Sequence, residues 1–255
     1  MLRTAIRLLK RAQSIAEELE TPDIIKRVQR GRLTYLDRSA LGWLAEHVKA
    51  VEREQVPGVL LETGCALGGS SIVIASSKNR ERRFQVYDVF GQIPPPSDKD
   101  GADVHARYAV ISSGKSKGID GDRYYGYESD VLGKVRSNFR ELGVDPEQNR
   151  VEFVQGLYEN SLHPSGPIAF AHIDCDWYDS VTVCLERIVP LLAPGGRMVI
   201  DDYFSYSGCR TAIWDYFRHQ LDHYKFVYGP RLMITSISAV PQPQATPAKG
   251  QPQAV

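Results

Sequence analysis

The stretch LLETGCALGGSS, residues 60–71, joins a short apolar run to a glycine-rich turn and a helix-forming segment. We predict a strand over residues 58–62, a turn over 64–69 and a helix over 70–77. Glycines in such a turn let backbone N–H groups and the helix N-terminus approach a bound group closely. A purely structural turn also fits this stretch in isolation, so its interpretation depends on the rest of the chain.

The alternation of short apolar runs and helical segments continues along the chain. Further strands are predicted over residues 84–89, 151–155, 168–174, 197–201 and 226–228. Further helices are predicted over residues 39–55, 130–142, 180–192 and 209–219. Strands that alternate with helices predict an α/β fold, in which a doubly wound, mostly parallel sheet carries helices on both faces.

Three segments do not follow this alternation. Residues 1–30 have apolar residues at helical spacing and predict an amphipathic helix for packing or oligomer formation, with membrane-surface binding as the alternative. Residues 92–128 are polar and rich in Gly, Pro, Asp and Tyr, which is typical of a lid-like loop or of a plain flexible insertion. We therefore expect an N-terminal helical segment (1–56), a main domain (57–239) and a disordered tail (240–255).

The composition restricts the partners and the compartment. Thirty-one basic residues balance 31 acidic ones, so no global charge draws the protein to nucleic acid or to an anionic membrane. The four cysteines show no CxxC spacing, and no signal peptide is recognisable, which favours the cytoplasm. Apolar runs are strand-sized, and no membrane span is predicted.

Two acidic residues lie at the ends of the first two predicted strands. Glu62 would repel a pyrophosphate but attract the ammonium of an amino-acid-like ligand, and Gly64 and Gly68 depart from the spacing of the dinucleotide fingerprint. Asp88 lies roughly 20 residues beyond the turn, where a carboxylate commonly accepts ribose hydroxyls. Capping of a local turn is the alternative role of Asp88. Together, the turn and the acid favour a nucleoside-bearing ligand.

Four ordered blocks extend this pattern: ExGxxxGGS at 62–70, YDxFGxIP at 87–94, HIDCDxYDS at 172–180 and PGGxxxIDDY at 194–203. They resemble the macrocin O-methyltransferase family, metal-dependent sugar O-methyltransferases of antibiotic biosynthesis that are distantly similar to catechol O-methyltransferase. The likeness extends over residues 32–220. It implies the Rossmann-like fold of class I methyltransferases and makes the main domain an S-adenosylmethionine-binding catalytic domain.

The resemblance also implies a set of cofactor-binding residues. Gly64 and Ser70 are expected against the methionyl part, Asp88 at the ribose and Gly156 beside the adenine. The full set that we predict is Thr34, Tyr35, Glu62, Gly64, Ala66, Ser70, Asp88, Gly156 and Asp174.

Three further carboxylates are predicted at the same edge of the sheet. Asp174 closes one predicted strand and Asp201 and Asp202 close the next, so all three reach the carboxyl ends of parallel strands. Clustered carboxylates repel one another unless a cation joins them, and Mg²⁺ (or Mn²⁺) prefers such oxygen ligands. For an isolated Asp-Asp pair, a turn or helix cap is the simpler explanation, whereas the resemblance favours the metal. Asp174 and Asp176 are the candidate proton acceptors, because Trp177 occupies the position of a Lys or His in some relatives.

The expected function is S-adenosylmethionine- and Mg²⁺-dependent O-methylation of a sugar hydroxyl in a glycosylated natural product, by a homo-oligomer. The acceptor is then a small-molecule glycoside. Catechol-like or phenolic O-methylation is the alternative activity, and a non-catalytic binding protein that keeps the fold is the alternative class. His219 and His223 lack the Glu of a zinc protease motif, and Ser70 lacks the GxSxG elbow of a hydrolase. Aromatic residues after the two acidic strands are candidates for an acceptor wall or for packing: Trp177, Tyr178, Tyr203, Phe204 and Tyr206.

Overall fold

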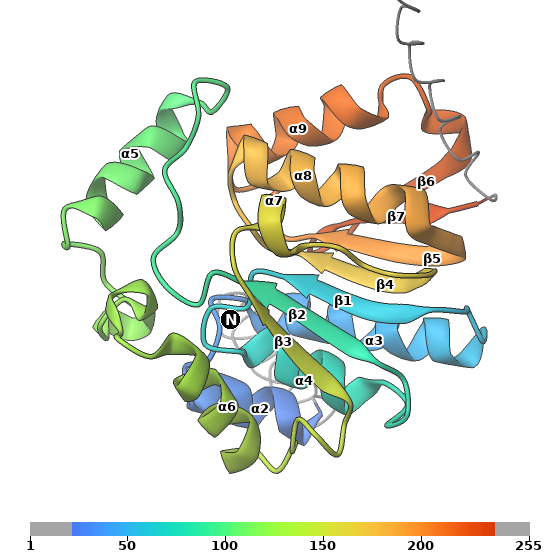
Figure 1. Cartoon of the computed structure of the whole chain (residues 1–255), viewed down its shortest axis with the longest axis horizontal. Helices are drawn as coiled ribbons and strands as arrows, with labels where there is room; N and C mark the ends of the chain where they lie inside the picture. Colours follow the sequence, from blue (N-terminus) through green and yellow to red (C-terminus); the bar gives the residue numbers. More distant parts are fainter. Residues whose placement is uncertain (1–21, 238–255) are drawn as a thin grey trace, which may run out of the picture.

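The computed structural model describes residues 22–237. They form a seven-stranded sheet of order β3-β2-β1-β4-β5-β7-β6 with helices packed against it (Figure 1). The strands are β1 (Val59–Thr63), β2 (Phe84–Asp88), β3 (Val151–Gln155), β4 (Ile168–Ile173), β5 (Leu192–Ile200), β6 (Tyr224–Tyr228) and β7 (Leu232–Ser236). Strands β1 to β5 pair in parallel, and β7 runs antiparallel to both β5 and β6. The predicted doubly wound, mostly parallel sheet is confirmed.

Helices cover both faces of this sheet. The α-helices are α2 (Asp23–Arg30), α3 (Arg38–Arg53), α4 (Gly69–Ser77), α5 (Ala102–Ser112), α6 (Val131–Glu141), α7 (Tyr158–Ser161), α8 (Tyr178–Ile188) and α9 (Ser207–Phe217). The 3₁₀ turns are η1 (Ile119–Gly121), η2 (Tyr125–Tyr127), η3 (Val189–Leu191) and η4 (Leu221–His223). Figure 1 shows α2, α3, α4 and α6 on one face and α7, α8 and α9 on the other.

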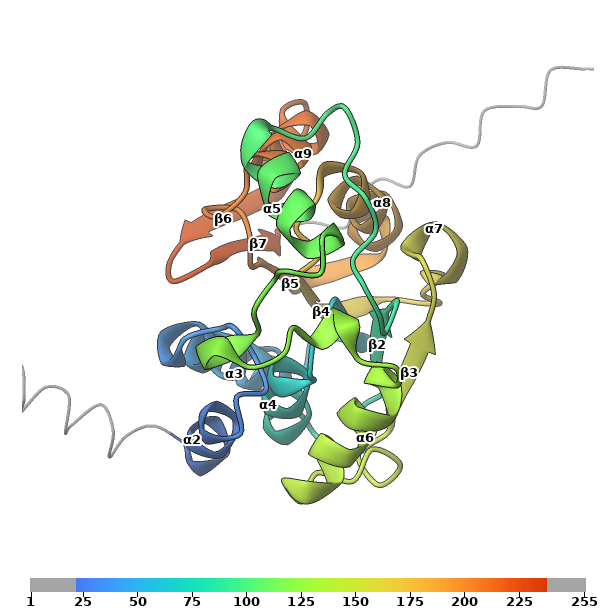
Figure 2. The same ribbon diagram turned by 90° about the vertical axis from the view of Figure 1, so that its left-hand side faces the viewer.

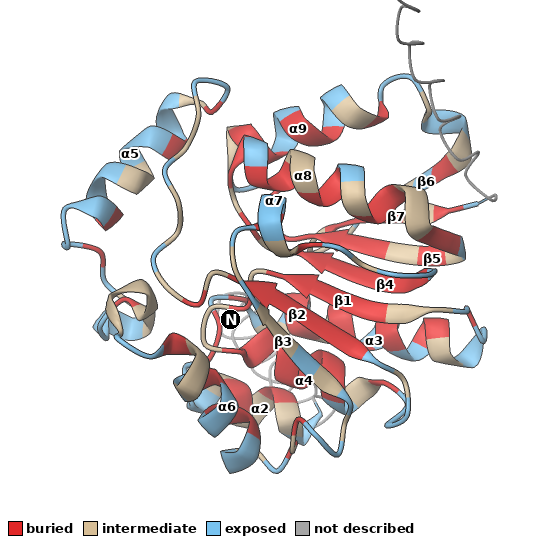
Figure 3. Ribbon diagram, viewed as in Figure 1, coloured by how far each residue is buried: buried red, intermediate tan, exposed pale blue. Residues whose placement is uncertain are grey.

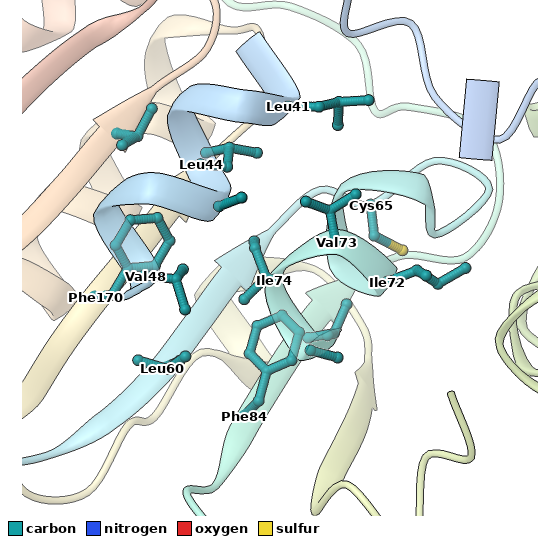
Figure 4. Close-up of a cluster of buried hydrophobic side chains, with 14 of the residues drawn as sticks. Leu41, Leu44, Val48, Leu60, Cys65, Ile72, Val73, Ile74, Phe84 and Phe170 are labelled. Atoms are coloured by element: carbon teal, nitrogen blue, oxygen red, sulfur yellow. The ribbon is translucent and has the colours of Figure 1, made fainter. Parts of the chain in front are cut away.

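Each face has its own apolar core, and buried residues concentrate in the strands and on the inner sides of the helices (Figure 3). Every residue of β2 and β4 is buried, as expected for central strands covered on both faces. Figure 4 shows the α3 side chains Leu41, Leu44 and Val48 against α4 and the sheet. This packing fixes the carboxyl ends of the strands relative to the turns that follow them.

The N-terminal helices belong to the same core as the main domain. Ile25 and Val28 of α2 are fully buried in the cluster that contains α3 and α4. Helix α3 starts one residue before the predicted range, and the Asp37 side chain caps it by accepting a hydrogen bond from Ala40 N at 2.8 Å. The first part of the predicted helix over residues 1–30 and the predicted tail after 240 lie outside the described residues.

Two parts of the chain differ from the expected elements. Strand β7 was not predicted, because it follows β6 after a turn of three residues, 229–231, and its apolar run is short. The interpretation of residues 92–128 as a loop was wrong, since α5 and two 3₁₀ turns lie within it. Helix α5 buries only Val104 and Ile111, so its apolar periodicity is too weak to recognise in the sequence.

None of the helices in the described range, residues 22–237, is long and apolar enough to cross a membrane.

Candidate functional site

Two adjoining cavities lie at the carboxyl edge of the sheet. The larger, here the carboxylate cavity, has a volume of about 190 Å³, and the smaller, the Asp88 cavity, has one of about 50 Å³. Both are lined by Gly64, Tyr125, Asp174 and Asp176. Because they share these four residues, the two cavities lie directly next to each other.

The glycine-rich turn brings the backbone of three strands together. Gly64 has a φ of 85°, and its N–H donates to Tyr87 O at 2.9 Å. The N–H of Asp174 donates to Thr63 O at 2.8 Å, and a Cβ on Gly64 would overlap the carbonyl oxygen of Asp174. The turn therefore requires glycine at position 64 for its left-handed backbone and for the close approach of β4.

Asp88 is held in place by the same turn. Its Oδ2 accepts a hydrogen bond from Cys65 N at 2.8 Å, and its Oδ1 accepts one from Phe90 N at 2.7 Å. Burial raises the pKa of Asp88, while the two N–H donors oppose this rise. A carboxylate has about four acceptor sites, so Asp88 keeps acceptors for hydroxyl groups of a ligand in the Asp88 cavity.

Glu62 does not reach either cavity. It is fully buried in β1, accepts a hydrogen bond from Ser71 Oγ on α4 and lies 2.8 Å from His172 Nδ1. Burial lowers the pKa of His172, but the carboxylates of Asp201 and Glu62 outweigh it and raise this pKa to about 10. The expected contact of Glu62 with a ligand ammonium is therefore corrected: its side chain points to the α4 face, where it pairs with His172.

Three carboxylates meet in the larger cavity. Oxygens of Asp174, Asp176 and Asp202 lie within 4.8 Å of one another. Burial and the charge of Asp201 raise the pKa of Asp174 well above its usual range, and burial and the charges of Asp176 and Asp174 do the same for Asp202. Within residues 22–237, Asp202 Oδ2 is buried without a hydrogen-bond partner. A divalent cation would relieve both the repulsion and the unpaired oxygen, so this donor set fits Mg²⁺.

Asp201 lines the same cavity but has different partners. Its Oδ1 accepts a hydrogen bond from Arg231 Nε and lies 3.9 Å from His172 Nε2. Burial opposes ionisation of Asp201, but His172 and Arg231 outweigh burial and lower its pKa. The sequence predicted Asp174, Asp201 and Asp202 as the metal ligands, whereas the structure groups Asp174 and Asp202 with Asp176. One oxygen of Asp201 is already bound by Arg231.

The remaining predicted residues divide into two groups. Thr34, Tyr35 and Ala66 line the carboxylate cavity. Ser70 and Gly156 line neither cavity. Ser70 is buried within α4, and Gly156 directly precedes residues 157–159, which line the Asp88 cavity. The backbone N–H of Gly69 donates to Leu33 O at 2.9 Å, which brings the 34–35 backbone to the site.

The insertion over residues 92–128, for which we predicted a lid-like loop, forms part of the wall of both cavities. It contributes Ile93 and Pro94 to the Asp88 cavity, and Arg107, Ile111, Tyr124 and Tyr125 to the carboxylate cavity. Figure 2 shows α5 in front of the carboxyl ends of the strands. In the sequence, the tyrosine-rich run at 124–127 was the one signal that this segment could line a site, but it did not show which residues it would face.

Hydrogen bonds attach this insertion to the helices that follow the acidic strands. Asp100 Oδ1 accepts one from Tyr178 N at 2.8 Å, and Asp103 Oδ2 accepts one from Ser207 N at 2.9 Å, at the starts of α8 and α9. Trp177 Nε1 donates to Pro94 O at 2.9 Å. The insertion is thereby tied to both segments that carry the carboxylates.

Comparison with known proteins gives a family match. The model of the macrocin O-methyltransferase family matches residues 30–224. The chain is 35% identical over 175 residues to an 8-demethyl-8-(2,3-dimethoxy-α-L-rhamnosyl)-tetracenomycin-C 4′-O-methyltransferase of Streptomyces olivaceus, covering 66% of this chain. The chain spans 61% of the length of that relative and 62% of a second curated relative.

Solved structures share the fold. The O-methyltransferase NovP is 24% identical, with a TM-score of 0.66 and coverage of 80% of this chain and 81% of that one. An O-methyltransferase from Bacillus cereus in complex with S-adenosylhomocysteine is 17% identical, with a TM-score of 0.53 over 89% and 96% of the two chains. The sheet and its helices are therefore those of the class I, Rossmann-like O-methyltransferases.

Proposed function

Because this chain belongs to the macrocin O-methyltransferase family, we propose that it transfers a methyl group from S-adenosylmethionine to a sugar hydroxyl of a glycosylated natural product. The observation that carries this proposal is that the two cavities adjoin and share part of their lining. One of them contains Asp88, the other contains the carboxylate cluster, and Gly64 and Asp174 line both. A cofactor bound across Gly64 would bring its methyl group to the carboxylates.

The lining of the Asp88 cavity suits the nucleoside part of the cofactor. Asp88 accepts the ribose hydroxyls in our proposal, and Leu157 and Tyr158, which line the same cavity, offer apolar surface to the adenine. Thr34, Ala66 and the backbone around Gly64 line the adjoining cavity, where they would face the methionyl part. The Bacillus cereus neighbour, which was solved with the demethylated cofactor, is consistent with this use of the fold.

The charges around the cavities favour a neutral acceptor. Among the described residues that line them, four aspartates face the carboxylate cavity and Arg107 is the one basic side chain. A sugar nucleotide would bring a pyrophosphate, which needs several cationic or N–H partners. We therefore propose a sugar that is already attached to its aglycone, as the name of the tetracenomycin relative describes for that enzyme.

The proposed chemistry uses the carboxylate cluster in two ways. Asp174 and Asp202 would hold Mg²⁺ or Mn²⁺, with Asp176 or Asp201 as the third ligand. When bound there, the cation would make a coordinated hydroxyl more acidic and orient it. Asp174 or Asp176 accepts the hydroxyl proton while the acceptor oxygen takes the methyl group from sulfur. Burial raises the pKa of Asp176, which makes its carboxylate a better base near neutral pH.

Methyl transfer can be tested directly with labelled S-adenosylmethionine. We expect label in rhamnosyl and other deoxyhexosyl glycosides, and none in the matched free aglycones, because the carboxylates bind a sugar hydroxyl in the proposal. Mass spectrometry of the products provides the measurement. Transfer to catechols and free aglycones instead of glycosides would establish the phenolic alternative. Binding of the cofactor without transfer to any acceptor would indicate a non-catalytic binding protein.

Asp88→Ala is expected to weaken S-adenosylmethionine binding by about 5- to 150-fold, the equivalent of about 1 to 3 kcal/mol for lost charged hydrogen bonds. Asp88→Asn keeps the shape and one acceptor, so it should fold normally and lose less affinity. Calorimetry measures both values. Asp145→Ala is the matched control, because Asp145 also accepts a backbone hydrogen bond, from Gln148 N at 2.9 Å, but lines neither cavity. Unchanged affinity in folded Asp88→Ala would refute the ribose assignment.

A further inference from the structure

Arg107 has no part in the chemistry proposed above, although it lies in the wall of the carboxylate cavity. It belongs to α5, whereas the four aspartates come from the segments after β4 and β5. Among the described residues lining this cavity, it carries the one basic side chain. A guanidinium is a planar group of five N–H donors and no acceptors. It therefore supplies the directional donors that the aspartates lack.

The guanidinium is held on two sides. Its Nη1 donates to Ser116 Oγ at 2.9 Å, and Ser116 is itself buried. Its Cζ lies 5.7 Å from the centroid of the Tyr124 ring, which is 3% exposed. The face of an aromatic ring attracts a cation, so this contact helps to hold the guanidinium in position. The two contacts restrict the position of the guanidinium, and Arg107 also lines the carboxylate cavity.

Two tyrosines that line the same cavity are affected by the charge of Arg107. Burial raises the pKa of Tyr206 to about 12, and the charge of Arg107 opposes this rise. Burial also raises the pKa of Tyr35, again against the charge of Arg107. Tyr35 precedes α3 and Tyr206 precedes α9, and both line the cavity. The guanidinium thus acts on polar groups from two separate segments of the cavity wall.

The size of the cavity limits what Arg107 can meet. Its volume of about 190 Å³ is below the roughly 300 to 1,000 Å³ of pockets for drug-sized ligands. The methionyl part of the cofactor would share this space, which therefore suits one sugar ring better than a whole glycoside. A sugar ring presents several hydroxyls of similar acidity, so the carboxylate cluster by itself cannot distinguish them. A second polar contact at a fixed position would make that choice.

We propose that Arg107 is a specificity-determining residue, which donates hydrogen bonds to a sugar hydroxyl next to the methylated one and so selects the hydroxyl that faces the carboxylates. This inference rests on the proposed function, because it requires a sugar in the carboxylate cavity. The two anchors, carboxylate cluster and guanidinium, then define a single orientation of the ring. Ser116 positions the guanidinium but does not touch the acceptor.

The test compares Arg107→Met and Arg107→Lys with wild type on an α-L-rhamnosyl glycoside and its 2-, 3- and 4-deoxy analogues. Arg107→Met should raise the acceptor KM by about 10- to 100-fold, the scale of a lost charged hydrogen bond. It should also give a mixture of methylated positions in the NMR spectrum of the product. For one deoxy analogue, wild type and Arg107→Met should have equal KM, because the hydroxyl that Arg107 binds is then absent. Arg107→Lys should restore part of the affinity but not the single product.

Two measurements separate this role from a structural one. Calorimetry of the rhamnoside with the protein saturated in S-adenosylhomocysteine should show weaker binding for Arg107→Met, while affinity for S-adenosylmethionine stays unchanged. Arg136→Met is the matched control, because Arg136 Cζ lies over the Phe153 ring, 5.8 Å from its centroid, but Arg136 lines neither cavity. It should behave as wild type in every assay.

Three results would overturn the inference. A single product with unchanged KM in Arg107→Met would exclude a role in selection. Equal losses in cofactor and acceptor affinity would indicate that Arg107 merely supports the fold. A wild-type protein that methylates no glycoside would overturn the proposed function as well, whereas the first two results leave that function intact.

Discussion

Asp202→Ala is expected to reduce methyl transfer by about 1,000-fold or more while S-adenosylmethionine binding stays close to that of wild type. The metal ligands supply several kcal/mol of transition-state stabilisation in the proposed mechanism, and each 1.36 kcal/mol corresponds to a factor of about ten in rate. Asp202 lines the carboxylate cavity and not the Asp88 cavity, so its removal leaves the nucleoside side untouched. Asp174→Ala should be equally inactive, but Asp174 lines both cavities, and some loss of cofactor affinity is expected there.

Chelation provides the second arm of this test. Excess EDTA should abolish transfer, and Mg²⁺ or Mn²⁺ should restore it. Asp179→Ala is the matched control, since Asp179 belongs to the same sequence block, is exposed and lines neither cavity. Full activity in EDTA, together with a metal-free purified protein, would refute the metal mechanism and leave proton transfer to Asp176.

Asparagine substitutions distinguish the third ligand from the base. Asp201→Asn and Asp176→Asn keep an oxygen but remove charge, so the variant that lowers Mg²⁺ affinity identifies the ligand. A lower kcat of Asp176→Asn at saturating Mg²⁺ would identify Asp176 as the proton acceptor, whereas an unchanged kcat would leave Asp174 in that role. Arg231 already engages Asp201 Oδ1, which predicts a smaller loss of Mg²⁺ affinity for Asp201→Asn. An equal loss in both variants would contradict that prediction.

Gly64→Ala is expected to lose cofactor binding and activity by about 100-fold or more and to unfold at a lower temperature. A Cβ at this position would overlap the Asp174 carbonyl, and the φ of 85° is itself strained for alanine. The Asp174 backbone must move to relieve the overlap, which shifts a residue common to both cavities. Each kcal/mol of strain lowers Tm by about 2 to 4 °C in a domain of this size.

A second glycine separates the effect of backbone strain from the effect of moving the Asp174 backbone. Gly143 has a φ of 74°, and a Cβ there would meet nothing within 4 Å. Gly143→Ala should therefore lower Tm slightly and leave cofactor affinity unchanged. Calorimetric binding and thermal unfolding of both variants give the comparison. Wild-type cofactor affinity in Gly64→Ala would show that the turn is not part of the cofactor site.

The sequence was sufficient for the family, the fold class and most elements. Its blocks at 62–70, 87–94, 172–180 and 194–203 identified the family that the comparison confirmed. Strand β3 was predicted with its observed bounds, because a short apolar run between turn residues is a local signal. Asp88 was predicted at the end of β2, since the end of a parallel strand fixes the edge to which an acid belongs.

The tertiary structure decided which polar and charged residues, distant in sequence, meet at the site. Arg231 reaches Asp201 from 30 positions away, Glu62 pairs with His172 across neighbouring strands, and Arg107 enters the carboxylate cavity from a helix that we did not predict. Side-chain periodicity shows which face of an element is buried, but it carries no information about the polar group that will meet it. The positions of carboxylates at the sheet edge could thus be predicted from the sequence, whereas their charge partners depend on how the insertion and the β6–β7 turn pack against that edge.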